Sequence, residues 1–457
     1  MAQAPARSIN QEFAEKFAGS LAMQQRANTV IAGGINHDGR FVQPFPPYIS
    51  HAEGAFKWDV DGNQLLDYVM GHGSLLLGHN DPDILAAMQA KIGHGTHLGA
   101  CSPHELEWAE EVQRLVPNAE RVRFTGSGTE STLLAIRIAR STTGKKMVLK
   151  FAGHFHGWND YLLKAEKPPF DAPFSPGIPE ETWDTVAVVE ANDPAALEAR
   201  LAKGDIAAVI MEATGGSWAT MPMHPDFPKQ ARELCTKYGA QLIFDEVITG
   251  FRWSPGGAQS FTGVTPDLAT FAKIIAGGMP GGAVTGTADA MAVLEFRSTP
   301  GWNATKKVRH QGTFNAQPVA SAAGTACLQK IADGEVQRYC DALASNFRAG
   351  LNGVLERRGL PGFAWGESSV FHIALGLTCT NRTAADLRDP QGPTPLELKS
   401  SDSSPANQLL YPAMLLEGIE FFHGGGLISR RHTQADIDRT IDAFDRVLGR
   451  LEAEGVL

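Results

Sequence analysis

The chain has 457 residues, of which 43% are hydrophobic and 20% are charged, the composition of an ordinary globular protein. Fifty acidic residues outnumber forty basic ones, and the formal charge of −10 argues against a nucleic-acid partner, which would require a basic surface. Five scattered cysteines without CxxC spacing argue against a disulfide framework or a metal site such as zinc, and favour a reducing compartment. The sequence shows no signal peptide and no apolar run of the roughly 20 residues that a membrane helix needs, so we expect a cytoplasmic protein without a membrane partner.

The first 75 residues (1–75) are expected to form an N-terminal arm and the first strands of a small domain. Residues 1–35 have the apolar spacing of helices and end in a glycine pair. The prolines within 41–49 exclude a helix there. Residues 54–69 then predict a hairpin of two short strands around Asp61-Gly62, a dipeptide favoured in tight hairpin turns.

Residues 76–330 are expected to form a large α/β domain. Helical segments alternate there with short apolar runs rich in β-branched residues, the pattern of βαβ units and of a parallel sheet buried on both faces. The expected strands are RVRF (121–124), KMVLKF (146–151), TVAVVE (185–190), IAAVIMEA (206–213), AQLIFDEV (240–247) and LATFAK (268–273).

Residues 331–457 are expected to form a smaller α+β domain. Its pattern consists of helices over 336–359 and 433–455, strands over 370–377 and 419–423, and a polar loop from Thr378 to Ala406. The predicted fold class is therefore α/β, with a mainly parallel central sheet in the large domain and a smaller α+β domain beside it.

Ligands of open α/β sheets bind beyond the carboxyl ends of the strands, so the residues that follow each expected strand are candidates for a site. The strand 121–124 is followed by a glycine-rich turn that contains Gly126, Ser127, Gly128 and Thr129 and opens a helix. Such a turn offers free N–H groups and the positive end of the helix dipole to a phosphate, although a capped turn without a ligand has the same pattern.

Two charged residues end buried strands. Asp245 ends the run AQLIF, where a carboxylate needs a cationic partner, a helix cap or the protonated ring nitrogen of a ligand. Lys273 ends the run LATFA, where burial lowers the pKa of the amine and suits it to form an imine with an aldehyde. The alternative for Lys273 is a side chain that extends to solvent.

The strand 146–151 is followed by Gly-His-Phe-His-Gly at 153–157. His154 and His156 have no Cys or carboxylate at ligand spacing nearby, which argues against a metal site, whereas Phe155 between glycines suits stacking on a planar ligand. A phosphate cradle, an aromatic platform, a carboxylate and an amine on one sheet are together the groups that pyridoxal 5′-phosphate (PLP) needs.

Five motifs resemble those of one enzyme family, the class III aminotransferases of PLP fold type I. They are GSGTES (126–131), GHFHG (153–157), FDEVITGFR (244–252), the stretch 256–283 and GTFNAQPVASAAG (312–324). Within the family, the sequence is similar to the branch that contains glutamate-1-semialdehyde 2,1-aminomutase and the β-amino-acid aminotransferases. The resemblance implies the PLP-dependent transferase fold type I, PLP as the cofactor, and 76–330 as the PLP-binding domain.

The resemblance also implies roles for residues around the cofactor ring. Lys273 would form the imine (Schiff base) with the aldehyde and move the substrate proton. Asp245 would keep the ring nitrogen protonated, Val247 and Phe155 would pack on the two ring faces, and Glu212 matches an acid near the phenolic side.

Other family roles concern the phosphate and the substrate. Ser127, Gly128 and Thr129 would hold the phosphate, and Thr313 matches a threonine that reaches it across a dimer interface. Arg40 matches an arginine that binds the substrate carboxylate, and a guanidinium suits that role because it grips a carboxylate with two hydrogen bonds.

We therefore expect a homodimeric PLP-dependent aminotransferase that works on small molecules. It would move an amino group from a carboxylate-bearing amino acid, β- and ω-amino acids included, to a keto acid or aldehyde. The alternative is an aminomutase-type intramolecular transfer, an isomerisation that needs no external amino donor. A catalytically silent binding protein is disfavoured because Lys273 is present.

Overall fold

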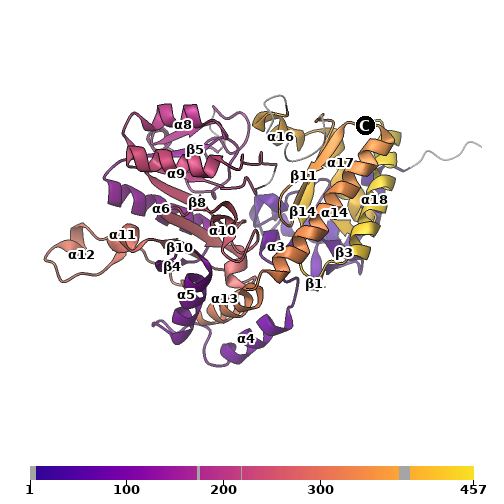
Figure 1. The fold of residues 1–457 in the computed structure, drawn as a ribbon. Coiled ribbons are helices and arrows are strands. Elements are labelled where there is room, and N and C mark those ends of the chain that lie inside the picture. Colours follow the sequence, from indigo (N-terminus) through magenta and orange to yellow (C-terminus); the bar gives the residue numbers. More distant parts are fainter. Residues whose placement is uncertain (1–6, 172–174, 218, 380–391) are drawn as a thin grey trace, which may run out of the picture.

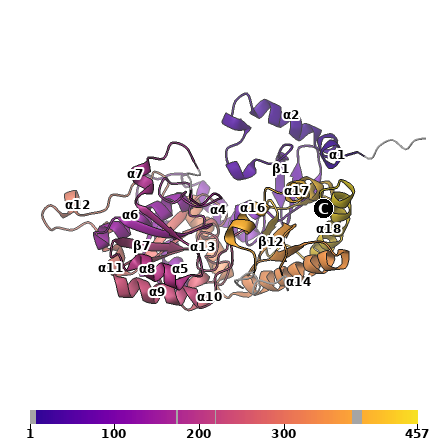
Figure 2. The same ribbon diagram turned by 90° about the horizontal axis from the view of Figure 1, so that it is seen from above.

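The computed structural model describes residues 7–171, 175–217, 219–379 and 392–457. The chain forms a large lobe around the central sheet and a smaller lobe that contains the last long helices (Figure 1). Seen from above, the N-terminal helices α1 (Ile9–Lys16) and α2 (Ala18–Ala27) lie along one side of the smaller lobe. The segment around α12 (Trp302–Thr305) projects away from the large lobe in both views (Figure 2). Within the described ranges, none of the helices combines the length and the apolar character needed to cross a membrane.

The central sheet has seven strands in the order β4-β10-β9-β8-β7-β5-β6. All run parallel to one another except β10, which is antiparallel to both of its neighbours. This confirms the predicted α/β class with a mainly parallel sheet. The strands are β4 (Arg121–Thr125), β5 (Met147–Phe151), β6 (Val186–Val189), β7 (Ile206–Met211), β8 (Gln241–Asp245), β9 (Leu268–Ala272) and β10 (Gly282–Gly286).

Helices cover this sheet, which explains why its strands are continuous apolar runs: every residue of β7 and β9 is buried. Helix α6 packs against β7, β8, β9 and β10, and α9 packs against β8. The helices of this lobe are α4 (Pro82–Ile92), α5 (Pro103–Leu115), α6 (Gly128–Thr143), α7 (Glu180–Trp183), α8 (Pro194–Leu201), α9 (Phe227–Tyr238), α10 (Gly257–Thr262), η3 (Lys273–Ala276), α11 (Ala288–Met291), η4 (Ala292–Leu294), α12 (Trp302–Thr305) and α13 (Pro318–Ile331).

The smaller lobe joins the two ends of the described chain. Strands β1, β2, β3 and β13 form one sheet in that order, and the C-terminal strand β13 pairs in parallel with β3. Strands β11, β12 and β14 form a second sheet. The strands are β1 (Ile49–Glu53), β2 (Phe56–Asp59), β3 (Gln64–Asp67), β11 (Gly362–Trp365), β12 (Val370–Leu375), β13 (Ile419–Glu420) and β14 (Gly425–Leu427). The helices are α1 (Ile9–Lys16), α2 (Ala18–Ala27), η1 (Ala32–Gly34), η2 (Asp38–Arg40), α3 (Met70–Gly73), α14 (Glu335–Arg358), α16 (Pro395–Ser401), α17 (Pro405–Leu416) and α18 (Gln434–Ala453).

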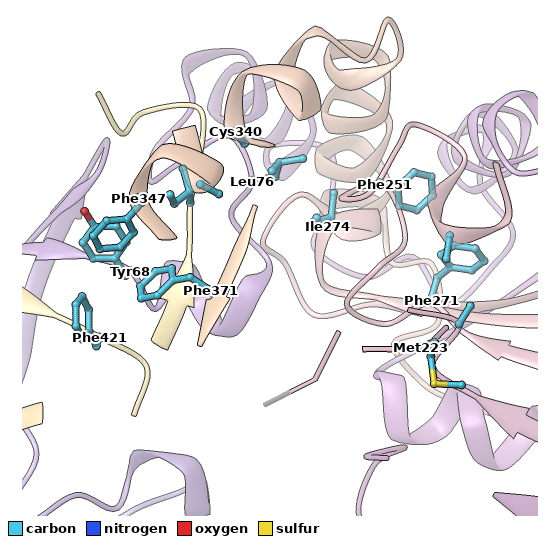
Figure 3. Packing of buried hydrophobic residues seen from close by; sticks show 14 of the residues in the cluster. Tyr68, Leu76, Met223, Phe251, Phe271, Ile274, Cys340, Phe347, Phe371 and Phe421 are labelled. Atoms are coloured by element: carbon cyan, nitrogen blue, oxygen red, sulfur yellow. The ribbon is translucent and has the colours of Figure 1, made fainter. Parts of the chain in front are cut away.

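An aromatic cluster forms the core of this lobe (Figure 3). The ring of Tyr68 lies 5.4 Å from those of Phe347 and Phe371 and 5.7 Å from that of Phe421. The Tyr68 hydroxyl lies 2.8 Å from Thr440 Oγ1, so its polar end is satisfied inside the core. Tyr68 therefore anchors the chain just after β3.

The N-terminal arm is helical, as expected, and divides at Phe17 into α1 and α2. The expected elements differ from the observed ones in several places. Strand β10 was not expected, because Gly282–Gly286 is too glycine-rich to resemble a strand, yet these residues are fully buried between β4 and β9. The polar loop from Thr378 to Ala406 contains helix α16, which a capping box at Thr394 begins, while 380–391 lie outside the described residues.

A buried ionic cluster connects the two ends of the chain. Lys57 Nζ lies 3.1 Å from Asp67 Oδ1 and 2.5 Å from Glu420 Oε2, and His79 Nε2 lies 2.7 Å from Asp67 Oδ2. The Lys57 ammonium holds the pKa of Asp67 below its usual value, whereas burial raises that of Glu420. Lys57 thus supplies the positive charge that compensates the two buried carboxylates of Asp67 and Glu420.

We expect Lys57→Met to lower the free energy of unfolding by about 3–5 kcal/mol, because it leaves two buried carboxylates without their cation. The loss should be larger at pH 8 than at pH 5. Glu420 has a raised pKa in the folded state, so its ionised form, which the variant cannot compensate, dominates as pH rises. Denaturant unfolding at both pH values measures this.

The matched control is Lys237→Met, which removes a lysine from an exposed ion pair with Glu198 on the surface. It should change stability little at either pH. A Lys57→Met protein as stable as the control would contradict the role assigned to the cluster.

Candidate active site

The carboxyl ends of β4, β5, β7, β8 and β9 meet at one edge of the central sheet, because these strands are parallel. Each of these strands is followed by residues that the sequence analysis identified as candidates for a site. The edge therefore gathers the glycine-rich turn, the loop of Phe155, and the side chains of Glu212, Asp245 and Lys273.

The glycine-rich turn leads directly into helix α6. Ser127 caps this helix, its Oγ accepting from Glu130 N–H at 3.3 Å. The N–H groups of Gly128 and Thr129 lie in the first turn, where a helix offers its own N–H groups no acceptor. A methyl group on Gly128 would lie 3.0 Å from Val247 Cγ2, so the turn packs closely on the segment after β8. The arrangement suits a phosphate group.

Asp245 is buried and held by three groups. His156 Nδ1 lies 2.7 Å from Asp245 Oδ2, while Val247 N–H (3.0 Å) and Thr270 Oγ1 (3.3 Å) donate to Oδ1. Burial raises the pKa of Asp245 to about 6 and lowers that of His156 to about 3. His156 is therefore a neutral imidazole whose Nδ1–H donates to the carboxylate and orients it.

Glu212 organises the loop that carries Phe155. Its Oε1 accepts from Phe155 N–H at 2.8 Å and from Ser217 Oγ at 2.6 Å, and its Oε2 accepts from Ser217 N–H at 2.7 Å. The Phe155 ring is 40% exposed although it lies at the edge of a buried sheet. A large apolar side chain fixed in this way can stack on a flat ligand.

Lys273 occupies an unusual backbone position. Its φ is +57°, a left-handed conformation that is uncommon for a residue other than glycine and is found in strained active-site positions. Burial lowers the pKa of its amine to about 8, with Asp245 acting in the opposite direction and Arg252 adding to the decrease. A larger fraction of neutral, nucleophilic amine is the consequence.

Arg252 is a site residue to which sequence reasoning gave no role, although it ends the motif FDEVITGFR. It is 1% exposed, and its Nη2 donates to Gly73 O at 2.6 Å while its Nη1 donates to Ser369 Oγ at 2.9 Å. His156 was likewise considered only as a metal ligand. Within the described ranges, no group of three or more His, Cys, Asp or Glu side chains is arranged to hold a metal ion.

Two predicted site residues lie apart from this cluster. Arg40, in η2, is exposed and lines a cavity of about 360 Å³ between the N-terminal segment and the strand β13. Thr313 is also exposed and lies outside the glycine-rich turn; its carbonyl oxygen accepts a hydrogen bond from His97 Nε2.

This fold, a mainly parallel seven-stranded sheet with a lysine and an aspartate at its carboxyl edge, is that of the PLP-dependent transferases of fold type I. Residues 39–360 match the family described as Aminotransferase class-III. The chain therefore belongs to the class III aminotransferases, and it is a PLP-dependent enzyme.

Individual relatives cover nearly the whole chain. It is 35% identical to glutamate-1-semialdehyde 2,1-aminomutase of Methanopyrus kandleri, over 96% of this chain and 99% of that protein. The crystal structure of an omega-transaminase from Sphaerobacter thermophilus has a TM-score of 0.83 and 33% identity, and covers 95% of this chain and 98% of its own. A beta-phenylalanine aminotransferase from Variovorax paradoxus has a TM-score of 0.82 and 29% identity over 97% of both chains.

The residues at the sheet edge fit PLP on structural grounds. The free N–H groups of Gly128 and Thr129 suit its phosphate, and the buried Asp245 carboxylate suits a protonated ring nitrogen. Gly157 has a φ of +88°, and a methyl group there would lie 2.5 Å from Thr129 Oγ1. The glycine is thus required for the loop after β5 to approach the glycine-rich turn at Thr129.

We expect Gly157→Ala to weaken the affinity for PLP at least about tenfold, because displacement of Thr129 removes hydrogen bonds to a charged phosphate. Cofactor retained after dialysis, followed by its absorbance, measures this. Gly144→Ala is the matched control. Gly144 also has a positive φ, +69°, but a methyl group there meets nothing within 4 Å. Equal cofactor loss in both variants would contradict a specific contact between Gly157 and the phosphate turn.

Proposed function

We propose that this enzyme transfers an amino group between a carboxylate-bearing amino acid, β- and ω-amino acids included, and a keto acid or aldehyde. The observation that carries the proposal is the pair formed by Lys273, with its lowered pKa, and the buried Asp245 on neighbouring strands. That pair supports amino-group chemistry, and the arginine beside the cavity supports an acidic substrate.

The cofactor, when bound, supplies an aldehyde that reacts with amines and a ring that withdraws electrons from the carbon bearing the amino group. In our proposal, Lys273 Nζ holds the cofactor in the resting enzyme and moves the proton that leaves the substrate carbon. The lowered pKa of Lys273 favours this, because a general base works best when its pKa is near the working pH.

The other residues of the sheet edge are proposed to orient the ring. Asp245, held by His156, keeps the ring nitrogen protonated, and Val247 and Phe155 pack on the two ring faces. Glu212 lies on the phenolic side and fixes the Phe155 loop. Ser127, Gly128 and Thr129 hold the phosphate; their place at the start of α6 supports this.

Arg40 is proposed to bind the substrate carboxylate. Its side chain borders the cavity together with apolar groups such as Val69 and Phe422. A volume of about 360 Å³ accommodates an amino acid with a sizeable apolar chain. Arginine and an apolar wall together suit a substrate that has an acid group and a hydrophobic part.

The second candidate function is an intramolecular amino transfer of the aminomutase type. It is favoured by the 35% identity to the Methanopyrus kandleri aminomutase over nearly the whole length of both chains. Such an enzyme would isomerise its substrate without an external amino donor or acceptor. The same lysine and aspartate serve either reaction.

We further propose that the enzyme is a homodimer in which Thr313 approaches the phosphate turn of the partner subunit. Phe314, the next residue, is 66% exposed, and Phe296, which precedes α12 in the sequence, is 79% exposed. Large exposed apolar side chains on one lobe are typical of a surface that another subunit covers.

We expect uptake of PLP by the cofactor-free protein to become faster as pH rises, with a midpoint near the pKa of about 8 of Lys273 rather than near that of an ordinary lysine. The reason is that only the neutral amine attacks an aldehyde. Stopped-flow absorbance measures the rate. Borohydride should then attach the cofactor to Lys273, as peptide mass spectrometry detects, and Lys273→Ala should take up no label. A label on another lysine would contradict the assignment.

One experiment separates the two candidate functions. The PLP-loaded enzyme is incubated with α-, β- and ω-amino acids, each with and without pyruvate or 2-oxoglutarate, and the products are identified. We expect new amino acids only when a keto acid is present. Conversion of a single amino aldehyde to its isomer without any keto acid would favour the aminomutase instead.

A further inference from the structure

The turn Met70–Gly73 has a strained backbone at the border between the two lobes. Four consecutive residues have positive φ: +45° at Met70, +59° at Gly71, +55° at His72 and +90° at Gly73. Left-handed conformations are uncommon for methionine and histidine, and a run of them persists only where the surrounding structure enforces it. Such strain is often found at sites of function.

Arg252 holds this turn next to Lys273. Arg252 Nη2 donates to Gly73 O at 2.6 Å, and this arginine is itself buried and fixed by Ser369. A methyl group on Gly73 would lie 3.6 Å from Lys273 Cδ, so the turn passes directly beside the lysine side chain. The position of His72 relative to Lys273 is therefore set by buried contacts.

The His72 ring faces the cavity that Arg40 also lines. Its centroid lies 4.7 Å from the ring of His37 and 5.1 Å, edge to face, from that of Phe422. Its Nδ1 is buried and has no hydrogen-bond partner among the described residues. A ligand in the cavity cannot reach this buried atom, so a hydrogen bond from His72 to a ligand has to come from the other ring nitrogen, Nε2.

The largest electrostatic effects on His72 come from basic groups. Burial, together with the positive charges of His37, Arg40, Lys273 and Lys57, lowers the pKa of His72 to about 4. The imidazole is therefore neutral and retains one N–H donor. Glu420 also lines the cavity, but Lys57 Nζ holds its carboxylate at 2.5 Å. The surroundings of His72 thus favour an anionic ligand.

We propose that His72 is a specificity-determining residue whose imidazole donates a hydrogen bond to the acid group of the substrate, next to Arg40. The inference rests on the proposed function, because it requires that the substrate bear a carboxylate. It adds that the strained turn places this second donor beside Lys273 of the large lobe, while both groups that hold the acid come from the smaller lobe.

The test uses the PLP-loaded enzyme and two probes that cannot react: 3-phenylpropanoate, and 3-phenylpropanamide as its uncharged counterpart. Titration calorimetry measures the affinity for each. His72→Gly tolerates the left-handed backbone but has no donor, and His72→Phe keeps a ring but has no donor. Both should weaken binding of the acid ~10-fold, the loss typical of a hydrogen bond to a charged group, and leave binding of the amide unchanged.

Three further variants complete the design. His72→Asn tolerates a positive φ and supplies an N–H donor, so it should bind the acid within about threefold of the parent enzyme. His51→Phe is the control, since His51 lies on β1 with its ring stacked on Trp58 and has no place in the cavity lining. It should bind both probes normally. Arg40→Ala tests the carboxylate site itself.

The outcomes separate the two proposals. If Arg40→Ala weakens acid binding but His72→Gly and His72→Phe do not, the role of His72 is wrong and that of Arg40 stands. If the parent enzyme shows no preference for the acid over the amide, the carboxylate site of the proposed function fails as well. An equal loss of acid and amide binding in the His72 variants would mean that His72 only shapes the cavity, which also overturns the inference.

Discussion

The burial of charge at the carboxyl edge of the central sheet is the constraint on which the site depends. Asp245 ends β8 and Lys273 follows β9, its neighbour, so two groups of opposite charge that are each costly to bury lie on adjacent strands. Each moderates the effect of burial on the pKa of the other. The remaining contacts of Asp245, above all the neutral His156, fix its direction. The free-energy cost of burying these charges therefore sets the pKa values of Asp245 and Lys273, and with them the reactivity of both groups.

Backbone strain is a second feature, and it is common to two residues near the site. Lys273 and His72 both have left-handed conformations, and they come from opposite lobes. Arg252 connects them: it belongs to the segment after β8, and it holds the carbonyl of Gly73. Tyr68, packed among the aromatic rings of the smaller lobe, anchors the same turn from the other side. A strained turn fixed at both ends keeps its side chains in one place, which catalysis and selective binding require.

Local sequence predicted the parts that depend on local pattern. The six apolar runs of the large lobe became β4 to β9, and both Asp245 and Lys273 were recognised because a charge at the end of an apolar run is unusual. Strand β10 was missed because its pairing depends on neighbours distant in sequence rather than on its own residues. Arg252, Lys57 and the pairing of His156 with Asp245 were missed for the same reason, since burial and partners decide their roles.

The division between the two lobes explains how relatives named for different reactions share this fold. The groups proposed to act on the cofactor lie at the sheet edge, on strands whose register is fixed by a closely packed core. The cavity is bounded instead by the segment that contains Arg40, by the turn of His72 and by Phe422 after β13. If this cavity binds the substrate, as we propose, substitutions in these three segments would change the accepted substrate more than they change the groups at the sheet edge. Differences in substrate among such enzymes are therefore to be sought in the loops of the smaller lobe and the N-terminal arm rather than in the sheet.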